Sequence, residues 1–257
     1  MRFAVSGGNG ENFNDGPVGF GGLVAGSLAV QSGDLITAIA GGSAFKSTGG
    51  QSAAGSGGSS PRDVRTPGGG GGGASQLNVN NNLIVVAGGG GGLGGWGDEN
   101  RSASFTFART GNTRGNAGQP GQDVSVINSA KVIVSSAGGG QPGTLASPGI
   151  GGTSRGSYTS TRNGLTGQGS AGANGISTST IASKLERGVS SGSGGGGYNA
   201  GGSGSILYWN RGTNEYTTLG GDGGGGSNYV FSAVSGASTG TTSKSVGMVI
   251  VLSLIHI

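Results

Sequence analysis

The chain has 257 residues, of which 66 are glycine, and its 14 basic and 10 acidic side chains give a formal net charge of +4. It contains no cysteine and a single histidine, His256, which excludes disulfides, thiolate or multi-histidine metal sites and a histidine-based catalytic triad. Disordered chains usually carry a high charge, so a chain with 9% charged residues lacks the common electrostatic reason to stay unfolded.

Strand-like segments recur from one end of the chain to the other. Residues 2–6 are predicted to form the first strand and residues 245–252 the last. Between them, four segments consist of an apolar run, a short polar turn and a second apolar run: 26–42, 73–92, 121–140 and 205–226. The runs are rich in Val, Ile, Leu and Thr, and the turns (31–34, 80–82, 128–130 and 210–214) carry Asn, Asp, Gly or Ser. We therefore expect four β-hairpins.

Glycine runs separate these hairpins, at residues 68–73, 88–92, 138–140, 194–197 and 223–226. Ordering glycine costs about 1–2 kcal/mol of backbone entropy per residue and buries no side chain in return. Extended polyproline-II arms without Cβ atoms would offset this cost by lying side by side and hydrogen-bonding to each other. The alternative is that the runs are flexible linkers. The flanking apolar strands favour packed arms.

These features predict an all-β fold, in which a sandwich-like framework of β-hairpins is combined with a bundle of packed polyglycine-II helices. Almost no α-helix is expected, since only residues 181–187 look briefly helical. Residues 1–252 are expected to form a single domain. Residues 253–257 are expected to be an apolar tail that is either truncated or a sequencing-adapter artefact.

Catalytic chemistry finds little support in the sequence, so we expect a protein that is not an enzyme and binds no cofactor. No glycine run is followed by Lys-Ser or Lys-Thr, as a phosphate-binding loop requires. The nearest acidic pair, Asp98 and Glu99, is adjacent on an extended chain, where the two side chains point apart. Together with Asn100 or Asp222 these oxygens are candidate calcium ligands, but a solvated turn explains them better.

The polar segments 101–122, 141–174 and 203–214 are the best candidates for a contact surface, because recognition tends to use loops on a rigid scaffold. The aromatic residues beside the glycine runs either cap the ends of the bundle or lie exposed as contacts. The candidate contact residues are Trp96, Arg101, Arg109, Arg114, Arg155, Tyr158, Arg162, Tyr208, Trp209 and Arg211. The arginines are not interleaved with aromatics as in single-strand nucleic-acid platforms, so no nucleic-acid partner is expected. No apolar run reaches the roughly 18 residues of a membrane span, so no membrane insertion is expected either.

Three stretches carry a resemblance to a known family: GGGGGGASQLNVNNNLIVVAGGGGG (68–92), GGGGYNAGGSGS (194–205) and GGGGSNYV (223–230). They resemble the glycine-rich domain of bacterial surface proteins and phage tail proteins, and are similar to the glycine-rich region of anaplastic lymphoma kinase-type receptors. The cysteines of the receptor versions are missing here.

The resemblance implies a β framework with polyglycine-II helices and an extracellular, cell-surface or virion location. The N-terminus does not look like a signal peptide, so the sequence shows no export route: another route, a place in a virion, or a missing true start remain open. We expect a structural or adhesive module, with assembly into fibres as one option, whose partners are its own copies or a protein or glycan receptor. The alternative is a phage tail-fibre tip adhesin that binds a bacterial surface receptor.

Overall fold

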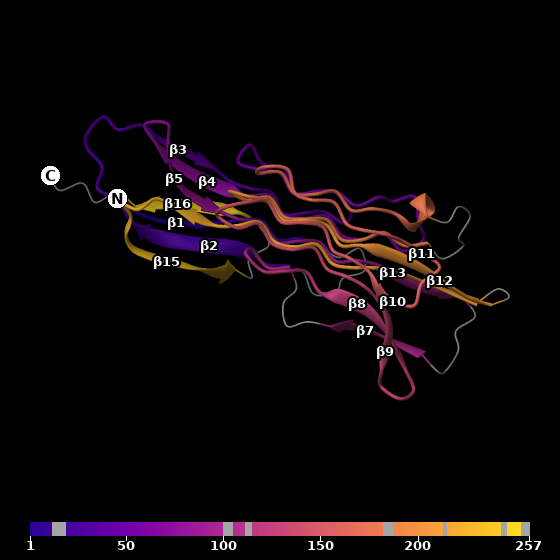
Figure 1. Ribbon diagram of the computed structural model, residues 1–257. Helices are drawn as coiled ribbons and strands as arrows, with labels where there is room; N and C mark the ends of the chain where they lie inside the picture. Colours follow the sequence, from indigo (N-terminus) through magenta and orange to yellow (C-terminus); the bar gives the residue numbers. More distant parts are fainter. Residues whose placement is uncertain are drawn as a thin grey trace.

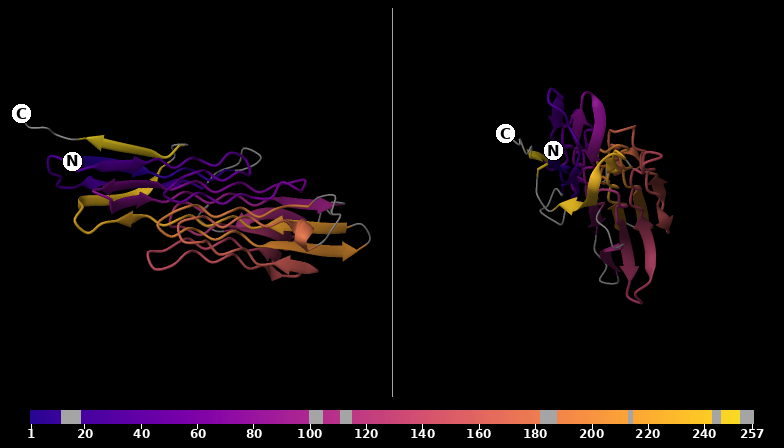
Figure 2. Two further views of the ribbon diagram at one scale, coloured as in Figure 1. Left: turned by 90° about the horizontal axis from the view of Figure 1, so that it is seen from above. Right: turned by 90° about the vertical axis from the view of Figure 1, so that its left-hand side faces the viewer.

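The computed structural model describes residues 1–11, 19–99, 105–110, 115–181, 188–212, 215–242 and 246–252. The molecule is elongated, with β-sheets at its two ends and long glycine-rich segments running side by side between them (Figures 1 and 2). The described residues form four antiparallel four-stranded sheets and no α-helix, which confirms the all-β prediction. The one helical element among them is a 3-10 turn, η1 (Thr178–Thr180). Of the expected helical stretch at 181–187, residues 182–187 lie outside the described residues, as does the tail at 253–257.

Two sheets pack together at the end that holds the N-terminus, and we call this pair the first sandwich (Figure 1). One sheet has the order β15-β2-β1-β16 and consists of β1 (Arg2–Ser6), β2 (Gly21–Ser27), β15 (Ser235–Thr242) and β16 (Met248–Leu252). The other has the order β14-β5-β4-β3 and consists of β3 (Ile36–Ile39), β4 (Ser75–Val79), β5 (Asn82–Ala87) and β14 (Tyr229–Val230). Alternate apolar residues of both sheets, such as Val5, Val24, Leu77 and Val85, are fully buried between the layers.

The opposite end holds the second sandwich, which is built in the same way. Its sheets have the orders β10-β9-β8-β7 and β11-β12-β13-β6. The strands are β6 (Trp96–Glu99), β7 (Phe105–Thr110), β8 (Asp123–Asn128), β9 (Ile133–Ala137), β10 (Arg155–Gly156), β11 (Ser160–Arg162), β12 (Ile206–Gly212) and β13 (Glu215–Gly220). The buried core comprises Val124, Val126 and Ala137 from one sheet and Leu207 and Leu219 from the other.

Three of the four predicted hairpins are confirmed. β4 pairs with β5, β8 with β9 and β12 with β13. The β4–β5 turn places Asn80 and Asn81 at φ values of 50° and 64°, the left-handed conformation that two-residue hairpin turns require and that asparagine tolerates. The predicted first and last strands are β1 and β16, and they pair with each other.

The predicted hairpin at residues 26–42 is wrong in its pairing, although its turn is present. Gly33 has φ 94°, and the backbone N–H of Gln31 donates to Asp34 Oδ2 at 2.7 Å. The strands before and after this turn enter different sheets, since β2 pairs with β1 and β15 while β3 pairs with β4. The turn therefore crosses from one layer of the sandwich to the other, where a shared strand ladder is impossible.

Several strands lie in segments that were predicted as loops. β7 falls within residues 101–122, and β10 and β11 fall within 141–174. The exposed strand β15, with the sequence SGASTGTT, was not predicted at all. β10 and β11 are short and β15 is rich in Ser, Thr and Gly, so these three lack the apolar alternation that identifies a half-buried strand.

The glycine segments between the sandwiches are connected by backbone hydrogen bonds that follow a period of three. In the segment 68–73, Gly69 and Gly72 donate to Leu93 and Gly90 of one neighbour, both at 2.7 Å. Gly70 and Gly73 donate to Lys46 and Gly42, both at 2.8 Å, whereas Gly71 donates to Gly58 at 2.9 Å. A β-strand bonds to neighbours on two sides only, with period two. Here the donors point in three directions.

Glycine is required in these segments because the backbones approach too closely for a side chain. A Cβ atom built on Gly72 would overlap the carbonyl group of Gly8, and one built on Gly89 would overlap that of Gly72. The same holds for most glycines of the middle region, where the obstacle is backbone rather than a side chain that could turn away. The middle of the molecule therefore has an interior made of peptide groups.

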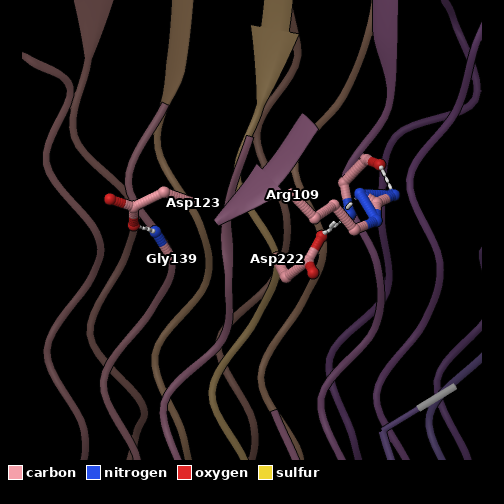
Figure 3. Close-up of polar contacts among 5 residues, drawn as sticks. Arg109, Asp123, Gly139 and Asp222 are labelled. Carbon is pink, nitrogen blue, oxygen red and sulfur yellow. Dashed lines mark hydrogen bonds and ion pairs between the residues drawn. The ribbon is translucent and has the colours of Figure 1, made fainter. Parts of the chain in front are cut away.

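Side-chain oxygens complete this network where no carbonyl of a neighbouring segment is in place. Asn9 Oδ1 accepts from the N–H of Gly21 at 2.9 Å and Asn228 Oδ1 accepts from that of Gly88 at 2.9 Å. Asp123 Oδ1 accepts from Gly139 at 2.8 Å (Figure 3). The scattered Asn, Ser and Asp residues beside the glycine runs thus satisfy buried donors that would otherwise be unpaired.

Candidate functional site

The second sandwich gathers aromatic and arginine side chains between its two sheets. On β7, Phe105, Phe107 and Arg109 occupy alternate positions and so share one face. Phe105 and Phe107 pack against the buried core of this sandwich, as does Trp209 of β12. We call the following residues the aromatic–arginine cluster: Trp96, Phe105, Phe107, Arg109, Trp209 and Arg211.

The rings of the cluster are in two pairs. Trp96 stacks on Phe107 with 6.3 Å between ring centroids and 13° between the planes. Phe105 meets Trp209 edge-on at 5.7 Å and 79°. Both geometries are favoured by the aromatic quadrupole, and each pair adds about 0.5–1.5 kcal/mol beyond the burial of its area. Trp96 is 41% exposed, so the cluster reaches the molecular surface.

Each ring pair carries one arginine. The guanidinium of Arg109 lies 4.8 Å from the ring centroid of Trp96. That of Arg211 lies 5.2 Å from the ring of Phe105 and 5.8 Å from that of Trp209. Cation–π contacts of this kind hold the planar guanidinium groups in place.

Arg109 also contacts Asp222, which belongs to the glycine-rich segments between the two sandwiches. We call these segments the glycine middle. Arg109 Nη1 lies 3.3 Å from Asp222 Oδ1, and Arg109 Nη2 donates to the carbonyl of Gly94 at 2.7 Å (Figure 3). The N–H of Gly94 in turn donates to Asp222 Oδ1 at 2.8 Å. Three positions earlier, Gly91 donates to the carbonyl of Gly115. The Asp222 carboxylate therefore takes the position that a neighbouring carbonyl would fill in the period-three pattern.

Burial raises the pKa of Asp222 to about 6, although the Arg109 guanidinium and the N–H of Gly94 act in the opposite direction. Asp222 is fully buried, and its second oxygen, Oδ2, has no hydrogen-bond partner among the described residues. Desolvation of the charged form thus outweighs the single ion pair. This carboxyl group protonates in the mildly acidic range.

The residues considered as calcium ligands do not lie together in one turn. Asp98 and Glu99 belong to β6, whose backbone pairs with β13. Asp222 is buried and committed to Gly94 and Arg109. Among the described residues, no group of three or more His, Cys, Asp or Glu side chains is placed to hold a metal ion. In that same part of the chain, no helix has the length and apolar character needed to cross a membrane.

Four of the predicted contact residues, Trp96, Arg109, Trp209 and Arg211, meet in the cluster. The structure does not bring Arg155, Tyr158, Arg162 and Tyr208 to it. Tyr208 lies on the opposite face of β12, 5.8 Å from the ring of Tyr216. Arg155 borders a cavity of about 220 Å³ beside Asp123. Tyr158 and Arg162 are exposed at β11 and the turn before it. Arg101 and Arg114 lie outside the described residues.

Sequence reasoning missed Phe105, Phe107 and the ion pair between Arg109 and Asp222. The alternation in the segment FTFART would have identified the first two, because every second side chain is aromatic or long and basic. No sequence signal joins Arg109 to Asp222, which are far apart in the chain.

No family model matches the sequence, and no curated protein is significantly similar to it.

Proposed function

We propose that this protein is a non-enzymatic structural and adhesive module whose glycine middle is a bundle of polyglycine-II helices. The period-three hydrogen bonds of residues 69–73 support this, because a three-fold helix sends successive amides in three directions. The close approach of neighbouring backbones, as between Gly72 and Gly8, supports it as well. Such a bundle is a rigid rod with a sandwich at each end.

The contact surface of this module is the aromatic–arginine cluster, and the observation that carries the proposal is the pairing of Trp96 with Arg109 and of Trp209 with Arg211. Trp and Arg are enriched among residues that dominate binding energy at interfaces. Because the rings and guanidinium groups already contact each other, these side chains lose little conformational entropy on binding. The partner is a protein or glycan receptor, and the module acts outside the cell, on a cell surface or on a virion.

Binding of the fluorescently labelled protein to a panel of intact bacterial cells tests this role. The variant Arg211→Ala is expected to weaken binding at least about tenfold, as loss of an interface anchor does. Arg155→Ala removes an arginine outside the cluster and is the matched control. Equal binding by Arg211→Ala and Arg155→Ala, or the absence of binding to every cell type, would contradict the proposal.

Assembly into fibres is the second role that we propose for the same module. The observation that favours it is strand β15, which lies at a sheet edge with seven of its eight residues exposed. An unpaired edge offers N–H and C=O groups to another chain. Concentration-dependent filaments in electron micrographs are the expected result, and a monomer at all concentrations would exclude this role.

A further inference from the structure

A groove of about 620 Å³ opens on the first sandwich, at the end of the molecule away from the aromatic–arginine cluster. It lies between the tip of the β4–β5 hairpin and the turn that carries Tyr198. Its volume is within the range of about 300–1,000 Å³ typical of small-molecule sites. The residues that define its chemistry are Asn80, Asn82, Leu83, Tyr198, Tyr229 and Phe231.

Aromatic rings form one side of the groove. Tyr198 stacks on Tyr229 with centroids 4.6 Å apart and 17° between the planes. Tyr198 is 38% exposed and Phe231 39% exposed, although the partly buried Tyr229 fixes the first of them in place. The groove therefore offers flat apolar surface that is held by stacking and reached by solvent.

Polar groups on the groove are of two kinds. The Asn80 side chain is committed to the hairpin tip, since it accepts from Leu35 N–H at 2.9 Å and donates to Asp34 at 2.6 Å. In contrast, the Asn82 side chain and the hydroxyls of Tyr198 and Tyr229 make no hydrogen bond to another described residue, although the Asn82 backbone belongs to the β4–β5 ladder. They are available as donors and acceptors toward a ligand.

The groove is also free of charge, because none of its lining side chains is acidic or basic. A charged ligand would lose its hydration in the groove without gaining a side chain of opposite charge, so its binding would be disfavoured. The matching ligand is neutral, has flat apolar faces for the rings, and has hydroxyl groups for the amide and the phenols. Sugar rings combine these properties.

We propose that this groove binds a neutral oligosaccharide, with one ring of the sugar lying on the Tyr198 face and hydroxyls bonded to Asn82. The proposal goes beyond the contact role of the aromatic–arginine cluster, because it uses a separate site on the opposite sandwich. A proline-rich peptide would also suit aromatic surface, but it offers few hydroxyls to the amide and phenol groups.

The test is a titration of the full chain, labelled with ¹⁵N, with four neutral trisaccharides in turn (maltotriose, cellotriose, mannotriose and triacetylchitotriose) and with a deca-proline peptide. The expected result is that at least one sugar shifts the backbone amide signals of Asn82, Tyr198 and Phe231. Shifts from the peptide alone, or from none of these probes, would overturn the proposal.

Two variants test whether the sugar binds in the groove. Tyr198→Ala and Asn82→Ala are each expected to weaken sugar binding about tenfold or more. Tyr158→Ala is the matched control, since Tyr158 is a 46% exposed tyrosine away from the groove. Asn82 lies on the exposed side of its strand, so its variant keeps the test valid if Tyr198→Ala fails to fold. Unchanged sugar affinity in Asn82→Ala would overturn the proposal.

The same titration on Arg211→Ala separates this site from the proposed contact surface. Sugar binding is expected to be unchanged in that variant, even where cell binding is lost. A parallel loss of sugar binding in Arg211→Ala would contradict a site on the first sandwich.

Discussion

The two sandwiches and the glycine middle both have a buried interior, but the groups that fill it differ. In the sandwiches, alternate side chains such as Leu77 and Leu219 are buried between sheets, as in most β proteins. In the middle, peptide groups take the place of side chains, and segments such as 68–73 bond to neighbours in three directions. At the two ends, the shapes of the side chains determine how the sheets pack. In the middle, the absence of side chains allows the backbones to pack closely.

This difference changes what a mutation does in each region. Removing atoms from a sandwich core leaves a cavity, whereas adding a single methyl group to the middle forces backbones apart. The middle also depends on the sandwiches, because the segment 88–95 runs from β5 at one end to β6 at the other. The strands at both ends thus align the glycine segments.

The largest effect is expected from Gly72→Ala. The new Cβ would overlap the carbonyl of Gly8 and disturb hydrogen bonds on several neighbouring segments at once. Overpacking costs about 1–3 kcal/mol and each disturbed hydrogen bond about 1 kcal/mol, so we expect a loss of roughly 3 kcal/mol or more. Urea unfolding measures it.

Gly240→Ala is the matched control for this substitution. Gly240 is an exposed strand residue with nothing within 4 Å of its virtual Cβ. Its replacement is expected to change the free energy of unfolding by less than about 1 kcal/mol. Equal losses for Gly72→Ala and Gly240→Ala would show that close packing of backbones does not stabilise the middle.

Truncation of the sandwich cores is expected to cause losses that overlap with that of Gly72→Ala and begin slightly lower. Leu77→Ala and Leu219→Ala each remove a fully buried side chain from one sandwich and are expected to cost about 2–5 kcal/mol. Leu145→Ala, at a 66% exposed position, should change stability by less than about 0.5 kcal/mol. If residues 1–252 form one domain, both core variants unfold in a single calorimetric transition. Two transitions, of which each variant shifts only one, would contradict this.

The buried carboxyl of Asp222 is expected to make stability depend on pH. Its pKa is raised to about 6 from 3.8, so the folded state binds the proton more tightly than the unfolded state. Its contribution is therefore full below pH about 4 and is lost as the pH rises through 6, by about 3 kcal/mol in total. Denaturation midpoints between pH 4 and 8 measure this slope, which Asp222→Asn should abolish.

Asp34 provides the contrasting carboxylate in the first sandwich. The N–H of Gln31 and the Asn80 amide lower the pKa of this exposed group, so its contribution is present above pH about 4 and is lost on acidification. Asp34→Asn is expected to leave the slope between pH 5 and 7 unchanged. A pH profile that is the same in the wild type and in Asp222→Asn would contradict the raised pKa.

The smallest effect is expected from Arg211→Ala, which removes a cation from the rings of Phe105 and Trp209. Because Nε and Nη1 of Arg211 are buried, these cation–π contacts are expected to contribute about 1–2 kcal/mol, so thermal unfolding should shift by only a few degrees. A much larger loss would indicate that Arg211 stabilises the core beneath the cluster rather than serving as a contact residue.

The sequence predicts the β framework well wherever two apolar runs flank a short polar turn. β1, β16 and three hairpins follow from runs such as LIVVA and from the asparagine turn at residues 80 and 81. The pairing of β2 was missed because the turn before β3 has the same composition whether it closes a hairpin or crosses between layers. The local sequence does not show whether the turn closes a hairpin or crosses between sheets, because the pairing depends on strands that lie later in the chain.

The candidate site was only partly accessible to sequence reasoning. Trp96, Arg109, Trp209 and Arg211 were identified by residue type, but their grouping depends on β6, β7 and β12 meeting in space. Asp222 shows the limit most clearly. In the sequence GGDGGGG it looks like a solvated turn, yet packing of the flanking glycines buries it completely.

Amide hydrogen exchange of the native protein tests the central claim most directly, namely that the glycine middle is an ordered interior made of backbone. The amides of Gly71, Gly72, Gly89 and Gly92 are all hydrogen-bonded to carbonyls of other segments. We predict that they exchange at least about a thousandfold more slowly than in an unstructured chain, as slowly as amides of β1 and β5. Exchange of these glycine amides at the rate of an unstructured chain, while the strands stay protected, would contradict the account.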